Sequence, residues 1–431
     1  MEGRQYQLSI DILEQIEEAA QYESGVASVP EVGHHLRPPF GNTIYYLHKK
    51  LKKRLPTFDY DTIICLPWIR MGGADYVAGQ FAHSLRRLMP EEKILCLRTA
   101  TGHLERPEWF PEGIDNVDLS DLLSQCDKLS AEYLLYVMFI GLRPKRIVNI
   151  NSLECWDVFK RFGRRLSNFL NLYAYLFCWD LTQTGVRVGY PGEFYPATGG
   201  FLSAIFTDTI YLKRELTRLY EVPPSLESKI VPLFTPTESR ADMATRAARS
   251  IGSMDLQKRP IVLWAGRLDR QKRFDLVLDI AAKMPHVDFL CWGKSVLDGP
   301  TTPYTCPPNV VLQTAFRSLD EIPWAGADVW LFTSAWEGMP TMLLQVAMKG
   351  LPVVASAVGG VPELINDDTG WPVRSINDVD AYVANLKEAI NNPMIGRERG
   401  LNLKHWAQSR HSVENYDAEI QRVLLQERRH D

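Results

Sequence analysis

A strand, a polar turn and a capped helix follow one another in a single segment of this chain. Asp328-Val-Trp-Leu-Phe-Thr333 is short, apolar and β-prone, which predicts a buried parallel strand. After the turn around Glu337, Pro340 suits the first position of a helix, where a missing N–H costs nothing. Gly350 predicts a left-handed helix end, and Pro352 blocks any continuation. The segment therefore predicts one strand–turn–helix unit of a parallel α/β sheet.

The start of this predicted helix has the properties of an anion site. The backbone amides of Thr341 and Met342 lie at the helix N-terminus, where they lack intrahelical partners and the macrodipole favours negative charge. Gln345 lies on the same face, about one turn or ~5.4 Å further along. The spacing predicts a phosphate at the turn and a ribose beside Gln345.

A second turn of the same kind follows. The apolar strand predicted over residues 352–356 leads to Gly359 and Gly360, and Pro362 is expected to open the next helix. Either turn alone is also compatible with an ordinary α/β crossover.

A third unit lies earlier in the chain. Residues 260–265 predict a strand, and Gly266 and Arg267 follow it directly, with Lys272 at the start of the next helix. Both cations are expected at the rim where open α/β sheets bind ligands. A planar guanidinium and a compact ammonium together suit a diphosphate.

In this order and spacing, these motifs resemble those of a known family. Gly266-Arg267-x4-Lys272, Glu337-Gly-Met-Pro340 and Gly359-Gly-Val-Pro-Glu363 look like the motifs of the group 1 glycosyltransferases, the retaining family 4 enzymes of GT-B fold. Upstream, Trp68-Ile-Arg-Met-Gly-Gly-Ala-Asp75 resembles the N-terminal glycine loop of that family. The resemblance covers about residues 60–425, and residues 1–58 lie outside it.

The resemblance implies roles for individual residues. Arg267 and Lys272 would be catalytic, because they bind the donor diphosphate and stabilise it as it leaves. Glu337 would be the third catalytic residue, because it hydrogen-bonds hydroxyls of the transferred sugar. The implied donor-binding residues belong to the glycine loop and to the turns at the strand ends: Gly72, Gly73, Gly266, Gly338, Met339, Pro340, Thr341, Met342 and Gln345.

One departure from the family concerns the nucleotide ribose. The family usually has a second glutamate eight positions after the first, and this chain has Gln345 there. A charged hydrogen bond contributes ~1.5–3 kcal/mol against ~0.5–1.5 for a neutral one. The expected penalty is therefore about one kcal/mol, or near tenfold in donor affinity.

The other departure concerns the acceptor. Family members often have a histidine after the fourth strand, whereas the corresponding segment, residues 146–151, ends in Asn151. Asn151, Asp180 and His103 are the acceptor-site candidates. For His103 and Asp180 a purely structural role fits equally well.

Length and pattern predict the α/β class with two domains. A chain of 431 residues is too long for one ordinary core, and its apolar strands alternate with helices. We expect the GT-B arrangement, in which two doubly wound, Rossmann-like parallel-sheet domains face an interdomain cleft. The expected divisions are an N-terminal helical extension, an acceptor domain, a nucleotide-sugar donor domain and a helix returning to the first domain, at residues 1–58, 59–240, 255–408 and 409–431.

Composition limits the cofactors and partners. The net charge of −4 excludes a strongly basic nucleic-acid binder, and the seven cysteines show no paired spacing, which favours reduced packing residues. We expect no cofactor and no metal, because Arg267, Lys272 and the helix amides supply positive potential. The Asp-x-Asp patterns at 59–61 and 378–380 do not lie at a strand end near the donor motifs.

The expected location is cytoplasmic, with peripheral contact at the inner face of the membrane as one option. The first residues do not resemble a signal peptide, and no apolar span reaches ~20 residues. A basic segment beside Leu47 and Leu51 fits an amphipathic helix on anionic lipid, and it equally fits a solvated helix face. Its cations are Lys49, Lys50, Lys52, Lys53 and Arg54.

These observations favour a retaining glycosyltransferase that moves a sugar from a nucleotide-diphosphate sugar to a saccharide or lipid-linked saccharide. The product would be an α-linkage, in cell-surface polysaccharide or glycan synthesis. A GT-B phosphorylase or epimerase would use the same phosphate site without a glycosyl acceptor. A catalytically silent GT-B domain acting as a binding or scaffold subunit would fit Gln345 and the missing histidine.

Overall fold

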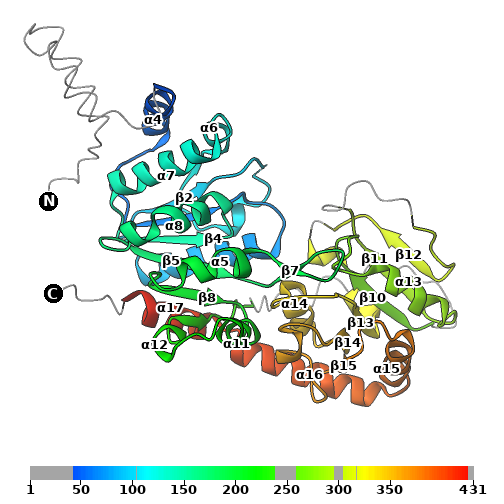
Figure 1. Cartoon of the computed structure of the whole chain (residues 1–431). Helices are drawn as coiled ribbons and strands as arrows, with labels where there is room; N and C mark the ends of the chain where they lie inside the picture. Colours follow the sequence, from blue (N-terminus) through cyan, green and yellow to red (C-terminus); the bar gives the residue numbers. More distant parts are fainter. Residues whose placement is uncertain (1–41, 103, 238–258, 296–303, 317, 426–431) are drawn as a thin grey trace, which may run out of the picture.

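The chain forms two α/β domains (Figure 1). This computed structural model describes residues 42–102, 104–237, 259–295, 304–316 and 318–425. His103, most of the predicted N-terminal extension and residues 241–254 between the two predicted domains lie outside these residues.

The N-terminal domain contains a seven-stranded sheet in the order β3-β2-β1-β4-β5-β8-β9. Every strand pair in it is parallel. Along β1, Ile63 and Cys65 enter one hydrophobic core while Ile64 and Leu66 enter another, so both faces of the sheet are covered. The strands are β1 (Thr62–Leu66), β2 (Ile94–Arg98), β3 (Asp115–Asp118), β4 (Arg146–Ile150), β5 (Asn171–Leu176), β8 (Ala204–Thr207) and β9 (Ile230–Pro232).

Different helices cover the two faces of this sheet. One face packs against α4 (Asn42–Arg54), α7 (Lys128–Leu142) and α8 (Leu153–Leu166). The other packs against α5 (Gly73–Leu88) and α17 (Val413–Leu425). The remaining elements are η1 (Pro107–Trp109), α6 (Ser120–Leu123), the antiparallel strands β6 (Asp180–Leu181) and β7 (Arg187–Val188), α9 (Tyr190–Glu193), α10 (Tyr195–Thr198), α11 (Ile210–Leu219) and α12 (Pro224–Glu227).

The C-terminal domain repeats this plan with six parallel strands in the order β12-β11-β10-β13-β14-β15. Helices α13 and α15 pack on one face, and α14 and α16 pack on the other. The elements are β10 (Ile261–Ala265), α13 (Phe274–Ala282), β11 (Asp288–Trp292), β12 (Val310–Gln313), η3 (Leu319–Glu321), η4 (Trp324–Gly326), β13 (Val329–Phe332), α14 (Thr341–Lys349), β14 (Val353–Ser356), η5 (Val361–Glu363), β15 (Trp371–Val373), α15 (Val379–Asn391) and α16 (Pro393–Arg410).

The end of the chain crosses back to the first domain. Tyr416, Ile420 and Leu424 of α17 are buried in the N-terminal core. Asp417 on the same helix pairs with Arg87 of α5 at 2.7 Å. This crossing gives the two domains a second connection besides the linker.

Both sheets have a topological switch point, where the strand order reverses. It lies between β1 and β4 in the first sheet and between β10 and β13 in the second. Ligands of open α/β sheets bind at the carboxyl ends of the strands beside such points. The predicted α/β, GT-B fold class is confirmed, and the fold places the loops after β1, β4, β10 and β13 at these positions.

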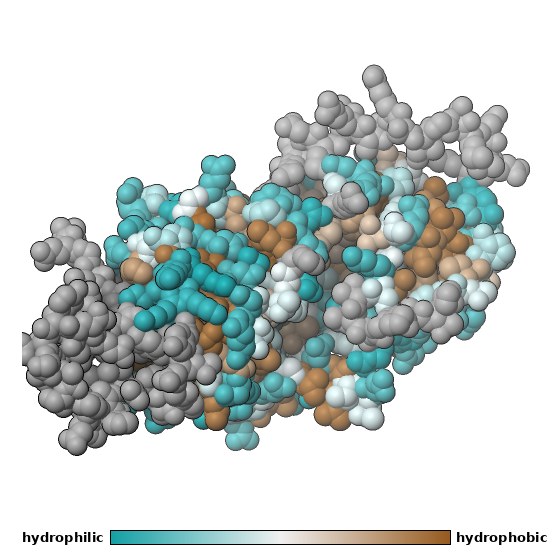
Figure 2. Space-filling model, turned by 90° about the horizontal axis from the view of Figure 1, so that it is seen from above, coloured by the Kyte–Doolittle hydropathy of each residue, from teal (hydrophilic) through white to brown (hydrophobic). Residues whose placement is uncertain are grey.

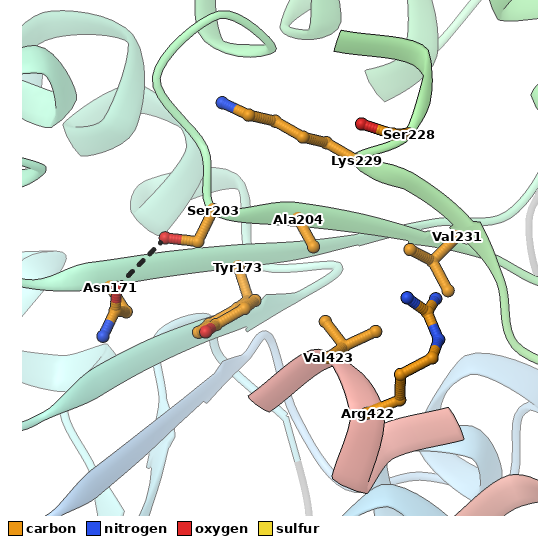
Figure 3. A pocket seen from close by; sticks show the side chains of 9 residues that line it. All are labelled: Asn171, Tyr173, Ser203, Ala204, Ser228, Lys229, Val231, Arg422 and Val423. Atoms are coloured by element: carbon orange, nitrogen blue, oxygen red, sulfur yellow. Dashed lines mark hydrogen bonds between the residues drawn. The ribbon is translucent and has the colours of Figure 1, made fainter. Parts of the chain in front are cut away.

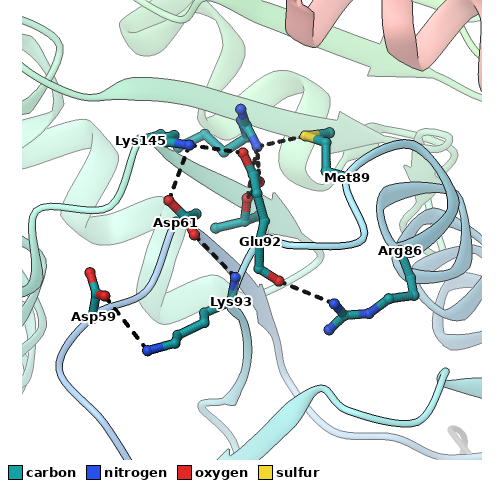
Figure 4. Close-up of polar contacts among 9 residues, drawn as sticks. Asp59, Asp61, Arg86, Met89, Glu92, Lys93 and Lys145 are labelled. Atoms are coloured by element: carbon teal, nitrogen blue, oxygen red, sulfur yellow. Dashed lines mark hydrogen bonds and ion pairs between the residues drawn. The ribbon is translucent and has the colours of Figure 1, made fainter. Parts of the chain in front are cut away.

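A buried ion pair joins strands and loops at the opposite end of the N-terminal sheet (Figure 4). The Arg146 side chain, 2% exposed in β4, pairs with Glu92. Glu92 also accepts from Lys145 at 3.2 Å, and Lys145 pairs with Asp61 at 3.2 Å. A charge buried this deeply is costly unless its partner is present.

Replacing Glu92 by alanine should therefore destabilise the N-terminal domain strongly. Loss of one partner of a buried pair costs ~3–5 kcal/mol, and Arg146 has little access to water as a substitute. The neighbouring Glu91 is exposed, so Glu91→Ala should stay within about 0.5 kcal/mol. Urea unfolding of both variants measures the difference, and equal midpoints would contradict the role of the pair.

Candidate active site

The candidate site starts at the switch point of the C-terminal sheet. Gly266 and Arg267 follow β10, and the turn containing Glu337 follows the neighbouring strand β13. The two turns lie next to each other because their strands are paired in register, Val262 with Val329 and Leu263 with Trp330.

An ion pair connects these two turns. Lys272 Nζ pairs with Glu337 Oε1, and Glu337 is only 8% exposed. The Lys272 carbonyl accepts the Thr333 hydroxyl at 2.7 Å, which ties the lysine backbone to the end of β13. The ammonium also lies 5.6 Å from the centre of the Phe332 ring. Lysine carries three donors, so this arrangement holds the cation in place and leaves it able to bind an anion.

Arg267 belongs to the same network. Its guanidinium bonds the Gln271 side chain, and its Nε lies 3.1 Å from Asp269 Oδ2. Gln271 Nε2 in turn donates to the Trp336 carbonyl at 2.9 Å, and the Ala335 amide donates to the Gln271 carbonyl at 2.7 Å. The basic turn and the glutamate turn are therefore one hydrogen-bonded unit.

Helix α14 points its N-terminus toward this unit. The amides of Leu343 and Leu344 donate to the Pro340 carbonyl at 3.0 and 3.3 Å, so Thr341 and Met342 supply the amides at the helix end. Pro340 lies one position before the helix rather than at its first residue. Gly350, with φ 65°, confirms the predicted left-handed cap. Gln345 lies one turn along α14 and is half-buried.

The glycine turn after β14 packs directly under Glu337. Gly359 has φ +54°, and a Cβ at this position would lie 1.8 Å from the Glu337 carbonyl oxygen. No side chain fits there. Pro362 lies at the start of a helix as predicted, but this helix, η5, is a 3-10 helix of only three residues. Glu363 ends this short helix, and its carboxylate accepts the backbone N–H of Tyr211 in the other domain.

The N-terminal domain brings its glycine loop to the same place. A Cβ built on Gly73, the first residue of α5, would lie 3.4 Å from Thr341 Oγ1 at the start of α14. The N-termini of two helices therefore approach each other across the domain boundary, and both favour an anion. At Gly72 a Cβ would lie 2.8 Å from Asp75 Oδ2. Burial raises the pKa of the Asp75 carboxyl to about 7.

The structure separates the acceptor candidates. Asp180, in the strand pair β6–β7, accepts the Trp336 indole N–H at 3.0 Å, which places it beside the donor motif. Arg270 donates to the Leu181 carbonyl at 3.3 Å from the other side. Asn151 lies after β4 in a left-handed conformation, φ 69°, at the carboxyl edge of the N-terminal sheet. His103 lies outside the described residues.

One residue at this boundary was not predicted. Asp208 follows β8 and accepts the Met339 amide at 2.8 Å from the opposite domain. The sequence signal that could have indicated Asp208 is its position as a polar residue directly after an apolar strand. Its partner could not be predicted, because Met339 lies 131 positions further along the sequence.

Among the residues that the structure describes, no group of three or more His, Cys, Asp or Glu side chains is able to hold a metal ion. The Asp-x-Asp residues bond elsewhere: Asp61 pairs with Lys145, and Asp378 caps α15. None of the described helices combines the length and apolar character needed to cross a membrane. The seven cysteines are free thiols.

A separate cavity of about 150 Å³ lies near the amino ends of β5 and β8, against α17 (Figure 3). The two cationic side chains that line it both bond to neighbouring groups. Lys229 donates to the Leu202 carbonyl at 3.1 Å, and Arg422 pairs with Glu419. The donor motifs contribute nothing to its lining.

Comparison with known proteins agrees with this geometry. Residues 259–392 match the family model for glycosyl transferases group 1. The chain is 27% identical to the sulfoquinovosyl transferase SQD2 of Arabidopsis thaliana over 31% of this chain and 27% of that protein. It is 30% identical to the alpha-maltose-1-phosphate synthase of Mycolicibacterium smegmatis over 35% and 45% of the two chains. The chain thus spans less than half the length of these curated relatives.

Solved structures show the same fold over most of the chain. Anabaena Alr3699/HepE, solved with UDP and glucose, has 13% identity and a TM-score of 0.61 over 85% of this chain and 99% of that one. The sucrose-phosphate synthase of Thermosynechococcus elongatus has 14% identity and a TM-score of 0.63 over 85% and 98%. The chain therefore has the GT-B fold, and the family match to the glycosyl transferases group 1 lies in its C-terminal domain.

Proposed function

We propose that the protein transfers a sugar from a nucleotide-diphosphate sugar to a saccharide or lipid-linked saccharide acceptor. The observation that carries this proposal is the convergence of Lys272, Arg267 and the α14 N-terminus at one switch point, with Gly73 facing them from the other domain. Two cations and two helix ends form a site for a diphosphate. The structural neighbour solved with UDP and glucose supports this class of ligand.

The proposed roles follow from position. Lys272 and Arg267 bind the diphosphate and stabilise its charge as it leaves. Glu337 is fixed by Lys272 and orients hydroxyls of the sugar. Gln345, one turn along α14 from Thr341, binds the ribose. Asn151 and Asp180 are proposed for the acceptor side, with His103 as a further candidate.

Transfer is proposed to retain the anomeric configuration and to give an α-linkage. The bond from the anomeric carbon to phosphate breaks while the bond to the acceptor oxygen forms on the same face. The acceptor proton passes to the leaving phosphate, so a side-chain base is not needed. We propose that no metal or cofactor takes part, since the cations and helix amides already provide the positive potential. A cytoplasmic role in cell-surface polysaccharide or glycan synthesis completes the proposal.

Lys272→Ala should lower kcat for transfer at least about 100-fold, the effect of removing one preorganised transition-state donor. The helix and strand around it should stay folded, because their apolar residues are buried independently of the ammonium. Lys283→Ala, at the exposed end of α13, is the matched control and should keep wild-type turnover. Release of labelled sugar from its nucleotide measures both. Unchanged turnover in Lys272→Ala would refute the assignment of Lys272 to the diphosphate. Activity of the wild type would exclude the alternative that the chain is a catalytically silent binding or scaffold subunit.

Gln345→Glu should tighten donor binding about tenfold, because a charged acceptor replaces a neutral one at the ribose. Isothermal titration with the donor nucleotide gives the dissociation constant. Gln421→Glu on the exposed face of α17 adds the same charge away from the site and should change nothing. Equal affinities in Gln345→Glu and wild type would place the ribose elsewhere.

Contact with an anionic membrane is a further part of the proposal. Leu47 and Leu51 of α4 are buried in the N-terminal core, so the apolar face of this helix is not free for lipid. The exposed Lys50 and Lys53 remain. Helix α8, on the same face of the sheet, adds the exposed Lys160, Arg164 and Arg165. Figure 2, seen from above, shows hydrophilic patches on the molecule with hydrophobic patches between them.

Vesicle sedimentation tests this contact. Each cation near an anionic surface contributes ~1 kcal/mol, so the double change Lys50→Glu and Lys53→Glu should weaken binding to phosphatidylserine vesicles at least about tenfold. Lys387→Glu with Arg397→Glu, both exposed on the other domain, makes the same charge change and should bind like wild type. No binding of the wild-type chain to anionic vesicles would refute the contact.

A further inference from the structure

Two carboxylates cross the domain boundary in opposite directions. Asp208 of the N-terminal domain, 4% exposed, accepts the backbone N–H of Met339 at 2.8 Å in the C-terminal domain. Glu363 of the C-terminal domain accepts the backbone N–H of Tyr211 at 2.7 Å, in the first turn of α11.

Glycines make room for this contact. A Cβ on Gly338 would lie 2.1 Å from Asp208 Oδ2, and a Cβ on Gly360 would lie 2.2 Å from Thr209 Cγ2. Asp208 and Thr209 therefore fit into two turns of the other domain that accept no side chain there. The same two turns contain the donor motifs.

We propose that Asp208 and Glu363 are positioning residues for the transfer reaction, which hold the Glu337–Met342 loop in its donor-binding geometry when the two domains close. This inference rests on the proposed function. Asp208 fixes the Met339 amide, two residues from Glu337, and leaves the amides of Thr341 and Met342 at the helix end for the donor. Glu363 binds the N-terminus of α11, where the helix dipole favours a carboxylate. The second oxygen of Glu363 pairs with Arg410 at 3.1 Å.

The surroundings of Asp208 make this contact sensitive to pH. Burial raises the pKa of its carboxyl to about 8, with the charges of Glu363 and Glu337 adding to the shift. Bonds from the Met339 amide and the Thr209 hydroxyl act in the opposite direction. Tyr175 and Cys178 are the other titratable groups that face it.

The sign of the pH effect follows from this shift. The pKa of Asp208 is raised in the contact, so the contact takes up a proton when it forms. It is fully favoured below the ordinary carboxyl pKa and weakens as the pH rises toward about 8. Above that value Asp208 no longer adds a pH dependence. An asparagine reproduces the neutral form and keeps an oxygen that accepts the Met339 N–H.

The test compares Asp208→Asn, Asp208→Ala and Glu363→Ala with the matched control Glu398→Ala, at an exposed position on α16. Donor kcat and KM are measured from pH 6 to 9, together with UDP affinity by calorimetry and the melting temperature. Asp208→Ala and Glu363→Ala should each raise the donor KM about tenfold, the effect of one lost hydrogen bond across the domain boundary. Asp208→Asn should keep the KM that the wild type shows at pH 6 and lose its rise toward pH 8.

The outcomes separate the two proposals. Wild-type turnover with an unchanged KM and an unchanged pH profile in all three variants overturns the positioning role alone. Variants with a lower melting temperature, a lower kcat and a higher KM but an unchanged pH profile indicate a purely structural contact. That result also overturns the positioning role. A wild-type chain that binds neither UDP nor any other nucleoside diphosphate overturns the proposed function, and this inference with it.

Discussion

The carboxyl ends of two parallel sheets meet at one domain boundary, and the remaining features of the candidate site depend on that constraint. A parallel sheet directs all its strand ends to one edge, and the reversal of strand order opens space there. Glu337 and Arg267 occupy this edge in the C-terminal sheet, while Gly73 and Asp208 occupy it in the other. Because the two edges contact each other, residues separated by more than a hundred positions form one polar site.

Pairs of opposite charge and one amide–carboxyl hydrogen bond hold the side chains and the loop of that site in position. Lys272 pairs with Glu337, Arg267 pairs with Asp269, and the amide before α14 bonds to Asp208. Both cations expected to bind the diphosphate are thus already oriented by a protein acceptor, and the loop that leads into α14 is held by Asp208. Groups held in this way need little reorganisation when the charge of a donor arrives, which is the condition for electrostatic stabilisation of a transition state.

Features encoded within one strand–turn–helix unit were predictable from the sequence. The strands around β10 and β13, the cap at Gly350 and the α17 helix pattern follow from apolar runs, glycine and proline. Contacts between units were not predictable in this way. Three hydrogen bonds depend on how the two domains are placed relative to each other. They join Asp208 to Met339, Glu363 to Tyr211 and Asp180 to Trp336. At Pro362 the sequence predicted a helix start but not the helix length, because a proline near the start fits a short 3-10 helix as well as a long α-helix.

The central claim is that the domain boundary binds a nucleoside diphosphate and its sugar, and a thermal-shift titration tests it most directly. UDP, GDP and ADP, alone and as their sugars, are titrated against the chain. One nucleotide series should raise the melting temperature in a saturable way, since a ligand at ~100 times its dissociation constant adds ~2.7 kcal/mol. A melting temperature that no nucleotide or nucleotide sugar raises would contradict the account.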